Sequence, residues 1–354
     1  MATSPRPHPA ALLVPLLVAL AAAALPAPPA RAVRAPAAPD TADTSVVAGL
    51  TRDAVALAPL FKTAPVEEFL AAAPRLPAPP VRTLWRDSAA TRWYNEAEQA
   101  RLGEAERALL VRRELPARFW YYTGYGTPLA YARALEVLGE HGLETLRGLR
   151  VLDFGYGGAG SITLLGQAGA EAVGVDVDPR LRALYAGDAA IEGWTSKAGG
   201  KARTVDGRWP ADAAAREAVG GGYDLVLSKN TLKRGYIHPE RPADPRQLVD
   251  LGVDDTTYVR ELHRILKPGG LALIYNLSPH RSKPDEPYRP WSDGRTPFPR
   301  ALFEQEGFRV IAYDVVDDVP ARALGKALGW DQGPGGMDLE NDLFGHYTLV
   351  ERSR

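Results

Sequence analysis

The sequence contains no cysteine among its 354 residues. This absence excludes disulfide bridges, thiolate metal sites and a cysteine nucleophile, and it leaves the redox compartment open. Six scattered histidines form no cluster, so no metal site is predicted. Neither sign of charge dominates, because 42 lysines and arginines accompany 43 aspartates and glutamates, for a net charge of −1. This balance gives no global attraction to nucleic acid or to an anionic membrane, so neither partner is indicated.

Long hydrophobic runs are also absent, apart from one near the N-terminus. The apolar run from about Ala10 to Leu25 is interrupted by Pro15 and is shorter than the roughly 20 residues of a membrane-spanning helix, so no stable span is expected. A positively charged start and the small-residue site Ala30-Arg31-Ala32 flank the run, as in a Sec-type signal peptide. We therefore predict a signal peptide over 1–32 and a secreted or periplasmic protein. A low-complexity leader on a cytoplasmic protein is the alternative.

The rest of the chain divides by composition into three parts. Residues 33–45 are rich in alanine and proline and are typical of a linker. Residues 46–127 form a predicted helical N-terminal extension, in which Thr91 to Leu115 reads as one exposed helix rich in alanine, leucine and glutamate. The aromatic stretch from Phe119 to Pro128 is expected to pack between subdomains, with a pocket lining as the alternative. The remaining residues, 128–354, form the main predicted domain.

Short apolar strands alternate with helical stretches through this main domain. A helix with one apolar face ends at Lys267-Pro268-Gly269-Gly270, which cannot continue it. Seven strands interleaved with helices predict an α/β fold, with helices on both faces of a mostly parallel sheet. The strand candidates are residues 151–154, 172–176, 202–206, 223–228, 271–276, 308–316 and 346–351.

The strongest local signal is a glycine-rich turn after the first of these strands. The turn starts at Gly155, and Asp176 follows 21 positions later at the end of the second strand, where a carboxylate can accept both ribose hydroxyls of an adenosine ligand. Asp206 ends the third strand. Because ligands bind at the carboxyl ends of parallel strands, Asp153, Asp176 and Asp206 are predicted to converge on one crevice. Taken singly, the turn could be only a tight connection and each aspartate only a helix cap.

Two classes of adenosine ligand fit this pattern. The run Gly155-Tyr156-Gly157-Gly158-Ala159-Gly160 satisfies G-x-G-x-x-G, which is typical of dinucleotide sites and makes NAD(P)-dependent oxidoreduction an alternative function. However, Asp153 lies two residues before the turn, where its charge would disfavour a diphosphate. A ligand with a cationic amino acid end would be favoured there.

At this point the chain resembles the class I S-adenosylmethionine-dependent methyltransferase family over about residues 128 to 352. The run from Leu152 to Ala159 is similar to the family's first motif, D-x-G-x-G-x-G, with Ala159 in place of the last glycine. Val173-Gly174-Val175-Asp176 resembles the second motif, and the run from Tyr223 to Ser228 resembles the fourth-strand motif. The run from Arg264 to Leu271 resembles the family's junction between a helix and the fifth strand, which dehydrogenases lack.

The resemblance implies a Rossmann-like fold with seven strands, the last of them antiparallel. It also implies S-adenosylmethionine as the cofactor and methyl transfer to a small or medium-sized acceptor, through oxygen, nitrogen or carbon. Asp176 would hold the ribose and Asp206 would face the adenine amine. The full set of implied cofactor-binding residues is Asp153, Gly155, Tyr156, Gly157, Asp176, Val177, Asp206 and Ser228.

Candidate catalytic residues follow the fourth strand. Methyl transfer needs alignment of the two reactants, and it needs a base only where the acceptor must lose a proton. His238 has a suitable intrinsic pKa for such a base, Tyr236 could orient a substrate and Asn230 could bind an amide, whereas a surface-loop histidine is the alternative reading of His238.

Two further features of this region stay open. The loop after the fourth strand is basic, with Lys229, Lys233, Arg234 and Arg241, which favours an acidic substrate unless these charges are simply solvated. The long loop from Ser278 to Pro299 is a candidate lid.

The predicted export conflicts with the predicted cofactor, because S-adenosylmethionine carries fixed charges and crosses a bilayer poorly. Three resolutions stay open: the leader does not export the protein, a transporter or trapped ligand supplies the cofactor, or the domain is an exported, non-catalytic adenosine-binding module. Nothing in the sequence indicates an oligomeric state.

Overall fold

A seven-stranded sheet forms the centre of the protein. The computed structural model describes residues 44–354 except 125, 188–190 and 192–193, so the predicted signal peptide and most of the predicted linker lie outside the described residues. The strand order is β6-β5-β4-β7-β8-β10-β9, and β10 runs antiparallel to both of its neighbours. The strands are β4 (Arg150–Phe154), β5 (Glu171–Asp176), β6 (Lys201–Asp206), β7 (Tyr223–Lys229), β8 (Leu266–Ser278), β9 (Phe308–Val316) and β10 (Phe344–Arg352). The predicted α/β class and all seven predicted strands are confirmed.

The central strands are parallel and buried on both faces, as expected for near-continuous apolar runs. In β4, Val151 to Phe154 are all buried. The parallel register places Asp176 beside Asp206 at the ends of β5 and β6. It also places Asp153 of β4 beside Leu227 of β7. The carboxyl ends of four strands therefore meet along one edge of the sheet.

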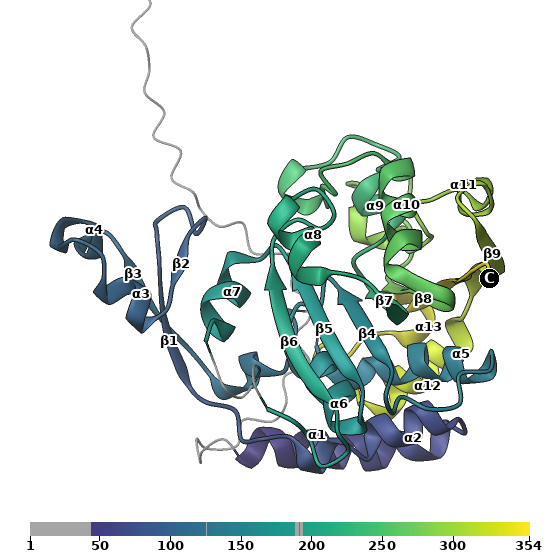
Figure 1. Ribbon diagram of the computed structural model, residues 1–354, viewed down its shortest axis with the longest axis horizontal. Helices are drawn as coiled ribbons and strands as arrows, with labels where there is room; N and C mark the ends of the chain where they lie inside the picture. The colour runs from purple at the N-terminus through teal and green to yellow at the C-terminus, as the bar shows by residue number, and fades with distance from the viewer. Residues whose placement is uncertain (1–43, 125, 188–190, 192–193) are drawn as a thin grey trace, which may run out of the picture. The chain divides into compact units, whose positions relative to one another are not determined.

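Helices cover the two faces of this sheet and enclose two hydrophobic cores. One core includes α1 (Thr44–Leu57), α2 (Ala64–Leu70), the 3-10 helix η4 (Pro128–Tyr131), α5 (Ala132–Glu140), α6 (Gly160–Ala168), α7 (Pro179–Tyr185) and α12 (Asp318–Ala327). The other includes α8 (Ala213–Val219), α10 (Asp255–Ile265) and α11 (Arg300–Gln305). Figure 1 shows α1, α2 and α6 on the lower side of the sheet and α8 and α10 on its upper side.

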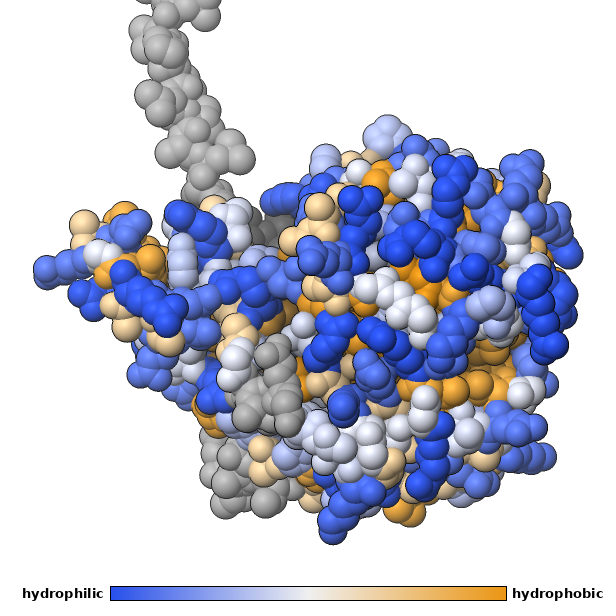
Figure 2. All heavy atoms as spheres, in the orientation of Figure 1, coloured by the Kyte–Doolittle hydropathy of each residue, from blue (hydrophilic) through white to orange (hydrophobic). Residues whose placement is uncertain are grey.

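Further short helices connect these elements. They are the 3-10 helices η1 (Ala58–Leu60), η2 (Ala73–Arg75), η3 (Ala117–Trp120), η5 (Pro245–Gln247) and η6 (Pro290–Ser292), with α9 (Arg234–Ile237) and α13 (Leu339–Asp342). Within the described residues, no helix is long and apolar enough to cross a membrane. The face drawn in Figure 2 is mostly hydrophilic, with apolar side chains scattered between charged ones.

The N-terminal extension contains helices, as predicted, and also a three-stranded antiparallel sheet in the order β2-β1-β3. The strands of this small sheet are β1 (Arg82–Arg86), β2 (Trp93–Tyr94) and β3 (Val111–Leu115), and the helices α3 (Glu96–Ala100) and α4 (Glu104–Ala108) lie between β2 and β3 in the sequence. The prediction of one helix from Thr91 to Leu115 is therefore wrong. Asn95 caps α3 together with Glu98, Gly103 starts a second short helix, and pairing with β1 turns 111–115 into a strand despite its helix-forming residues.

Candidate functional site

The glycine-rich turn joins β4 to α6 and packs closely against the protein's own chain. Gly155 and Gly157 have φ values of +71° and +62°, in the left-handed region that favours glycine. A Cβ atom at Gly155 would overlap the side chain of Thr231, and one at Gly157 would lie 3.3 Å from Thr123. The two threonines come from the loop after β7 and from the aromatic segment. Both glycines are therefore needed for the turn's shape and for the close approach of these segments.

Asp176 organises this turn from the end of β5. Its carboxylate accepts hydrogen bonds from three backbone N–H groups, those of Gly157 (3.0 Å), Val177 (2.7 Å) and Asp178 (3.0 Å). Burial raises the pKa of Asp176, and the backbone donors oppose this shift. Among the described residues, one oxygen accepts from Val177 and Asp178 and the other from Gly157 alone, so the second oxygen keeps the capacity to accept from a ligand.

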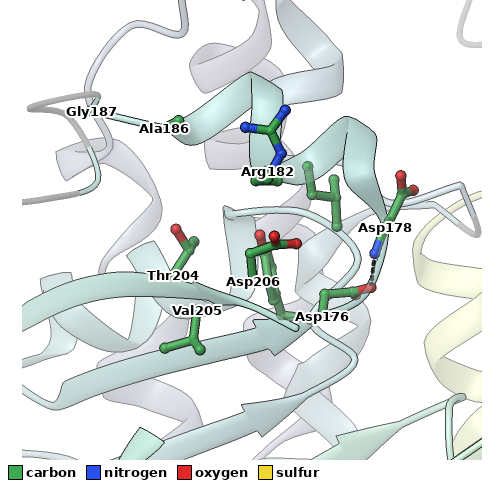
Figure 3. Close-up of a pocket in the computed structure, with 10 residues that line it drawn as sticks. Asp176, Asp178, Arg182, Ala186, Gly187, Thr204, Val205 and Asp206 are labelled. Atoms are coloured by element: carbon green, nitrogen blue, oxygen red, sulfur yellow. Dashed lines mark hydrogen bonds between the residues drawn. The ribbon is translucent and has the colours of Figure 1, made fainter. Parts of the chain in front are cut away.

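A cavity of about 250 Å³ opens beside Asp176, at the carboxyl ends of β5 and β6. Asp176, Asp206 and Thr204 contribute polar atoms to its wall, while Tyr156 and Val205 contribute apolar surface. Figure 3 shows Asp176 and Asp206 at neighbouring strand ends, with Arg182 of α7 across the cavity. Two of the three aspartates predicted to converge therefore line one cavity, and Asp153 is not among its lining residues.

Arg182 joins this cavity to the N-terminal extension. Its guanidinium donates to the carboxylate of Glu98, in α3, and to the backbone carbonyl of Trp93, in β2. Partial burial raises the pKa of Asp206, and the positive charge of Arg182 opposes that shift. The extension thus helps to position a cation beside the acid that ends β6.

Asp153 lies beneath the turn and is completely buried. It accepts hydrogen bonds from the hydroxyls of Tyr131 (3.0 Å) and Ser161 (2.6 Å). Burial raises the pKa of Asp153 to about 6, although both hydroxyls and the nearby Lys229 oppose the shift. No solvent-accessible surface remains on Asp153, so its carboxylate acts on its surroundings through its charge and through the side chains it holds.

The other implied cofactor-binding residues have different surroundings. Tyr156 is buried against Gly174, where an added Cβ would lie 2.7 Å from its ring, and it forms part of the cavity wall. Val177 is 59% exposed, and the structure assigns it no place in the cavity wall. Ser228 is buried and accepts a hydrogen bond from the Leu232 N–H (3.2 Å).

The three candidate catalytic residues lie outside the cavity wall. His238 follows α9, is 45% exposed, and its Nε2 lies 2.8 Å from the Asp255 carboxylate. Tyr236 is buried in α9. Asn230 has a left-handed φ of +64°, and its side chain accepts from the Leu277 N–H (2.7 Å). Asn230 therefore shapes the loop that carries Thr231 onto the glycine turn.

The loop from Ser278 to Pro299 packs against this same region. The carbonyls of Asp293 and Arg295 accept from the backbone N–H groups of Gly235 and Arg234, in α9. No residue of the loop lines the described cavity. A lid role for the loop stays a prediction.

Sequence reasoning missed several residues that build the site. Arg182, Thr123 and Thr231 gave no signal, because each is a single polar residue whose partners are distant in sequence. The aromatic segment is buried as expected at Trp120 and Tyr121, although Tyr125 lies outside the described residues. The Trp120 carbonyl accepts from the Tyr185 hydroxyl (2.7 Å), which in turn accepts from the Ala159 N–H (2.9 Å) of the glycine-rich turn.

Comparisons with known proteins give matches among solved structures alone. No protein-family model matches the chain, and no curated protein matches it. An S-adenosylmethionine-dependent methyltransferase from Mesorhizobium loti shares 18% identity, covering 63% of this chain and 98% of its own, with a TM-score of 0.36. The cyclase SpnF shares 16% identity, covering 66% and 86%, with a TM-score of 0.37. Magnesium protoporphyrin IX methyltransferase from Synechocystis PCC 6803 shares 14% identity, covering 63% and 82%, with a TM-score of 0.32.

The fold assignment rests on the sheet itself. Dinucleotide-binding folds have the strand order 3-2-1-4-5-6. Here the antiparallel last strand, β10, is inserted between β8 and β9. This insertion gives the seven-stranded sheet with an antiparallel last strand that the sequence motifs implied. The chain therefore has the Rossmann-like fold of the class I S-adenosylmethionine-dependent methyltransferases.

Proposed function

We propose that the protein transfers the methyl group of S-adenosylmethionine to a small or medium-sized acceptor. One observation carries the proposal: Asp176 and Asp206 lie beside each other in the sheet register and line one cavity next to the glycine-rich turn. These are the positions at which the sequence motifs place the ribose acid and the acid facing adenine. The acceptor and the atom methylated are left to experiment.

The residues around the cavity fit an adenosine group. The second oxygen of Asp176 can accept from a ribose hydroxyl, and the carboxylate of Asp206 can accept from an exocyclic amine. Tyr156, Leu181 and Val205 supply apolar wall for a purine ring. The cavity of about 250 Å³ is smaller than the roughly 300–1,000 Å³ of most small-molecule sites, so we assign it to the adenosine end of the cofactor.

The bound cofactor would supply a methyl group already activated on a sulfonium. The remaining task for this chain is to hold the acceptor in line with that methyl group and to exclude water. Two segments border the glycine turn where this would occur: the loop after β7, which carries Thr231, and the aromatic segment, which carries Thr123. We assign acceptor positioning to these two segments. The base role of His238 stays a prediction. Its ring lies beside the Asp255 carboxylate on an exposed surface, outside the cavity wall.

The first experiment is isothermal titration of the full chain with S-adenosylmethionine, S-adenosylhomocysteine and, as a control, NAD. We expect binding of the first two alone. Asp176→Asn should weaken that binding by about tenfold or more, because hydrogen bonds to a charged group contribute about 1.5–3 kcal/mol. Asp244→Asn is the matched control, since Asp244 pairs with Arg246 on the surface. Unchanged affinity in the folded Asp176 variant would contradict the site assignment.

A second candidate function is a non-catalytic, exported module that binds adenosine ligands. The observation that favours it is the packing of Thr231 and Thr123 over Gly155 and Gly157, which leaves the open cavity at the adenosine end. The module should bind S-adenosylhomocysteine yet form none of it from S-adenosylmethionine in the presence of varied acceptors. Turnover with any acceptor would exclude it, and fractionation of expressing cells would test the predicted export separately.

A further inference from the structure

Two lysines lie at the carboxyl end of β7, one partly exposed and one buried. Lys229 is the last residue of β7 and lies two positions after Leu227, which pairs with Asp153, so Lys229 and Asp153 share one face of the sheet. Lys233 follows just before α9 and is only 3% exposed. Among the described residues, no carboxylate lies within 4 Å of either ammonium, since neither lysine forms an ion pair. Lys233 is therefore not simply solvated, whereas Lys229 keeps part of its surface exposed.

The two ammonium groups differ in their contacts. The Nζ of Lys233 donates to the backbone carbonyls of Leu277 (2.6 Å) and Trp291 (3.1 Å), so it holds two segments together with neutral partners. The Nζ of Lys229 lies 5.5 Å from the ring centre of Tyr131, and no hydrogen bond joins it to the described part of the chain. The Nζ of Lys233 also lies 5.6 Å from the ring centre of Tyr236, so both ammonium groups have a cation–π contact, and within the described part of the chain Lys233 alone adds hydrogen bonds.

The charges of this region do not balance. Asp153 is the carboxylate that acts on Lys229, but the two form no ion pair, and the oxygens of Asp153 accept hydrogen bonds from the hydroxyls of Tyr131 and Ser161 instead. Burial lowers the pKa of Lys229 to about 8 and that of Lys233 to about 7, and the charge of Lys229 contributes to the second shift. When all three groups are ionised, the cluster carries one uncompensated positive charge. Lys229 is partly exposed and forms no hydrogen bond within the described part of the chain, so an anion supplied from outside the chain can reach its ammonium and would stabilise the charged form.

We propose that Lys229 binds the carboxylate of a ligand at the carboxyl ends of β4 and β7, on the edge of the sheet that also carries the described cavity. Ligands of open α/β sheets occupy this edge, where the strand order reverses between β4 and β7. Two molecules could bring the carboxylate: the amino acid end of S-adenosylmethionine, or an acidic acceptor. The identity of these two ligands rests on the proposed function. The expectation that Lys229 binds an anion rests on the surroundings of the lysine.

The first arm of the test separates the cofactor's carboxylate from the rest of the cofactor. Three proteins are titrated with S-adenosylhomocysteine and with 5′-methylthioadenosine: the full chain, Lys229→Gln and the control Lys201→Gln. The control changes an exposed lysine at the start of β6, at the opposite edge of the sheet. The second ligand has the adenosine and thioether without the amino acid. If Lys229 holds the cofactor's carboxylate, Lys229→Gln lowers the affinity for S-adenosylhomocysteine by about tenfold or more and leaves the affinity for 5′-methylthioadenosine unchanged.

The second arm tests an acidic acceptor, with malonate as the probe. Malonate is added to each protein saturated with S-adenosylhomocysteine, and the midpoint of thermal unfolding is followed. If Lys229 holds the acceptor's carboxylate, malonate raises the midpoint of the full chain and of Lys201→Gln but not of Lys229→Gln, and Lys229→Arg restores the response. The same affinities for all three ligands in a folded Lys229→Gln protein would overturn the proposal.

Failure of the proposed function gives a different pattern. If the full chain binds neither S-adenosylhomocysteine nor 5′-methylthioadenosine, the methyltransferase proposal fails. Malonate titration of the ligand-free proteins then decides on Lys229 alone: stabilisation that is lost in Lys229→Gln supports the anion site, and no stabilisation of the full chain overturns it.

Discussion

Replacing Asp153 with asparagine should change how stability depends on pH. Asp153 is fully buried between the hydroxyls of Tyr131 and Ser161, and burial raises the pKa of its carboxyl to about 6 from an ordinary value of 3.8. Asparagine has the same shape and does not titrate. Its amide can accept from one hydroxyl and donate to the oxygen of the other, so both contacts survive.

The sign of the effect follows from proton binding. Between pH 3.8 and about 6, the folded protein binds more protons at Asp153 than the unfolded chain does. The stability that the neutral carboxyl contributes is therefore fully present below about pH 4 and is lost as the pH rises through 6. A shift of about two units corresponds to about 3 kcal/mol. Relative to the native protein, Asp153→Asn should gain about 3 kcal/mol of unfolding free energy between pH 4 and pH 7.

Urea denaturation followed by circular dichroism at a series of pH values measures this difference. Subtracting the two proteins at each pH removes the other titrating groups, which both share. Ser161→Ala is a useful companion, because the Ser161 hydroxyl lowers the pKa of Asp153 and its loss should move the transition to higher pH. A difference that stays flat with pH, or that has the opposite slope, would refute the reasoning and show that Asp153 is an ordinary charged carboxylate.

Three further substitutions test the fold and the site. Asp317→Ala removes the buried carboxylate paired with Arg133 (2.8 and 2.9 Å) and leaves the more exposed Glu140 as its partner. The variant should cost about 3 kcal/mol of unfolding free energy in urea, with most of it regained in the double variant Arg133→Met, Asp317→Leu. Gly160→Ala places a methyl group against the Tyr121 carbonyl and should cost about 1–3 kcal/mol of unfolding free energy, which lowers the midpoint of thermal unfolding. An unchanged midpoint would mean that α6 and the aromatic segment separate easily. Glu98→Gln breaks a partly exposed ion pair with Arg182 of α7 and should cost less than about 1 kcal/mol of unfolding free energy. The affinity for S-adenosylhomocysteine should change less than tenfold. A larger loss of affinity would show that the extension forms part of the ligand site.

Periodic features of the sequence predicted the sheet and part of the site. The seven strands were predictable because buried parallel strands are apolar runs separated by helices. The proximity of Asp176 and Asp206 followed as well, because parallel neighbours bring their carboxyl ends to one edge. Residues 91–115 were mispredicted because their alanine and glutamate content favours a helix, while pairing with β1, a distant strand, determines the outcome for 111–115.

Contacts between distant single residues were not predictable in this way. Arg182 meets Glu98 across 84 positions, and Thr231 lies on Gly155 across 76. No periodicity marks such residues, since each contact depends on where the whole fold places two loops. The same reason explains Lys229: its sequence neighbours indicate only a basic loop, and its contact with the ring of Tyr131 appears once the sheet has formed.

Asp176 illustrates why the structure changes the design of the binding experiment. Three backbone N–H groups depend on its carboxylate, so Asp176→Ala would leave them unpaired and would distort the glycine-rich turn as well as remove a ribose partner. Asp176→Asn keeps one acceptor oxygen at the same place and removes the charge. A loss of affinity in the asparagine variant that exceeds its loss of stability therefore belongs to the ligand. Equal losses would instead show that Asp176 acts mainly by holding the turn, and the ribose would then need another partner in the cavity.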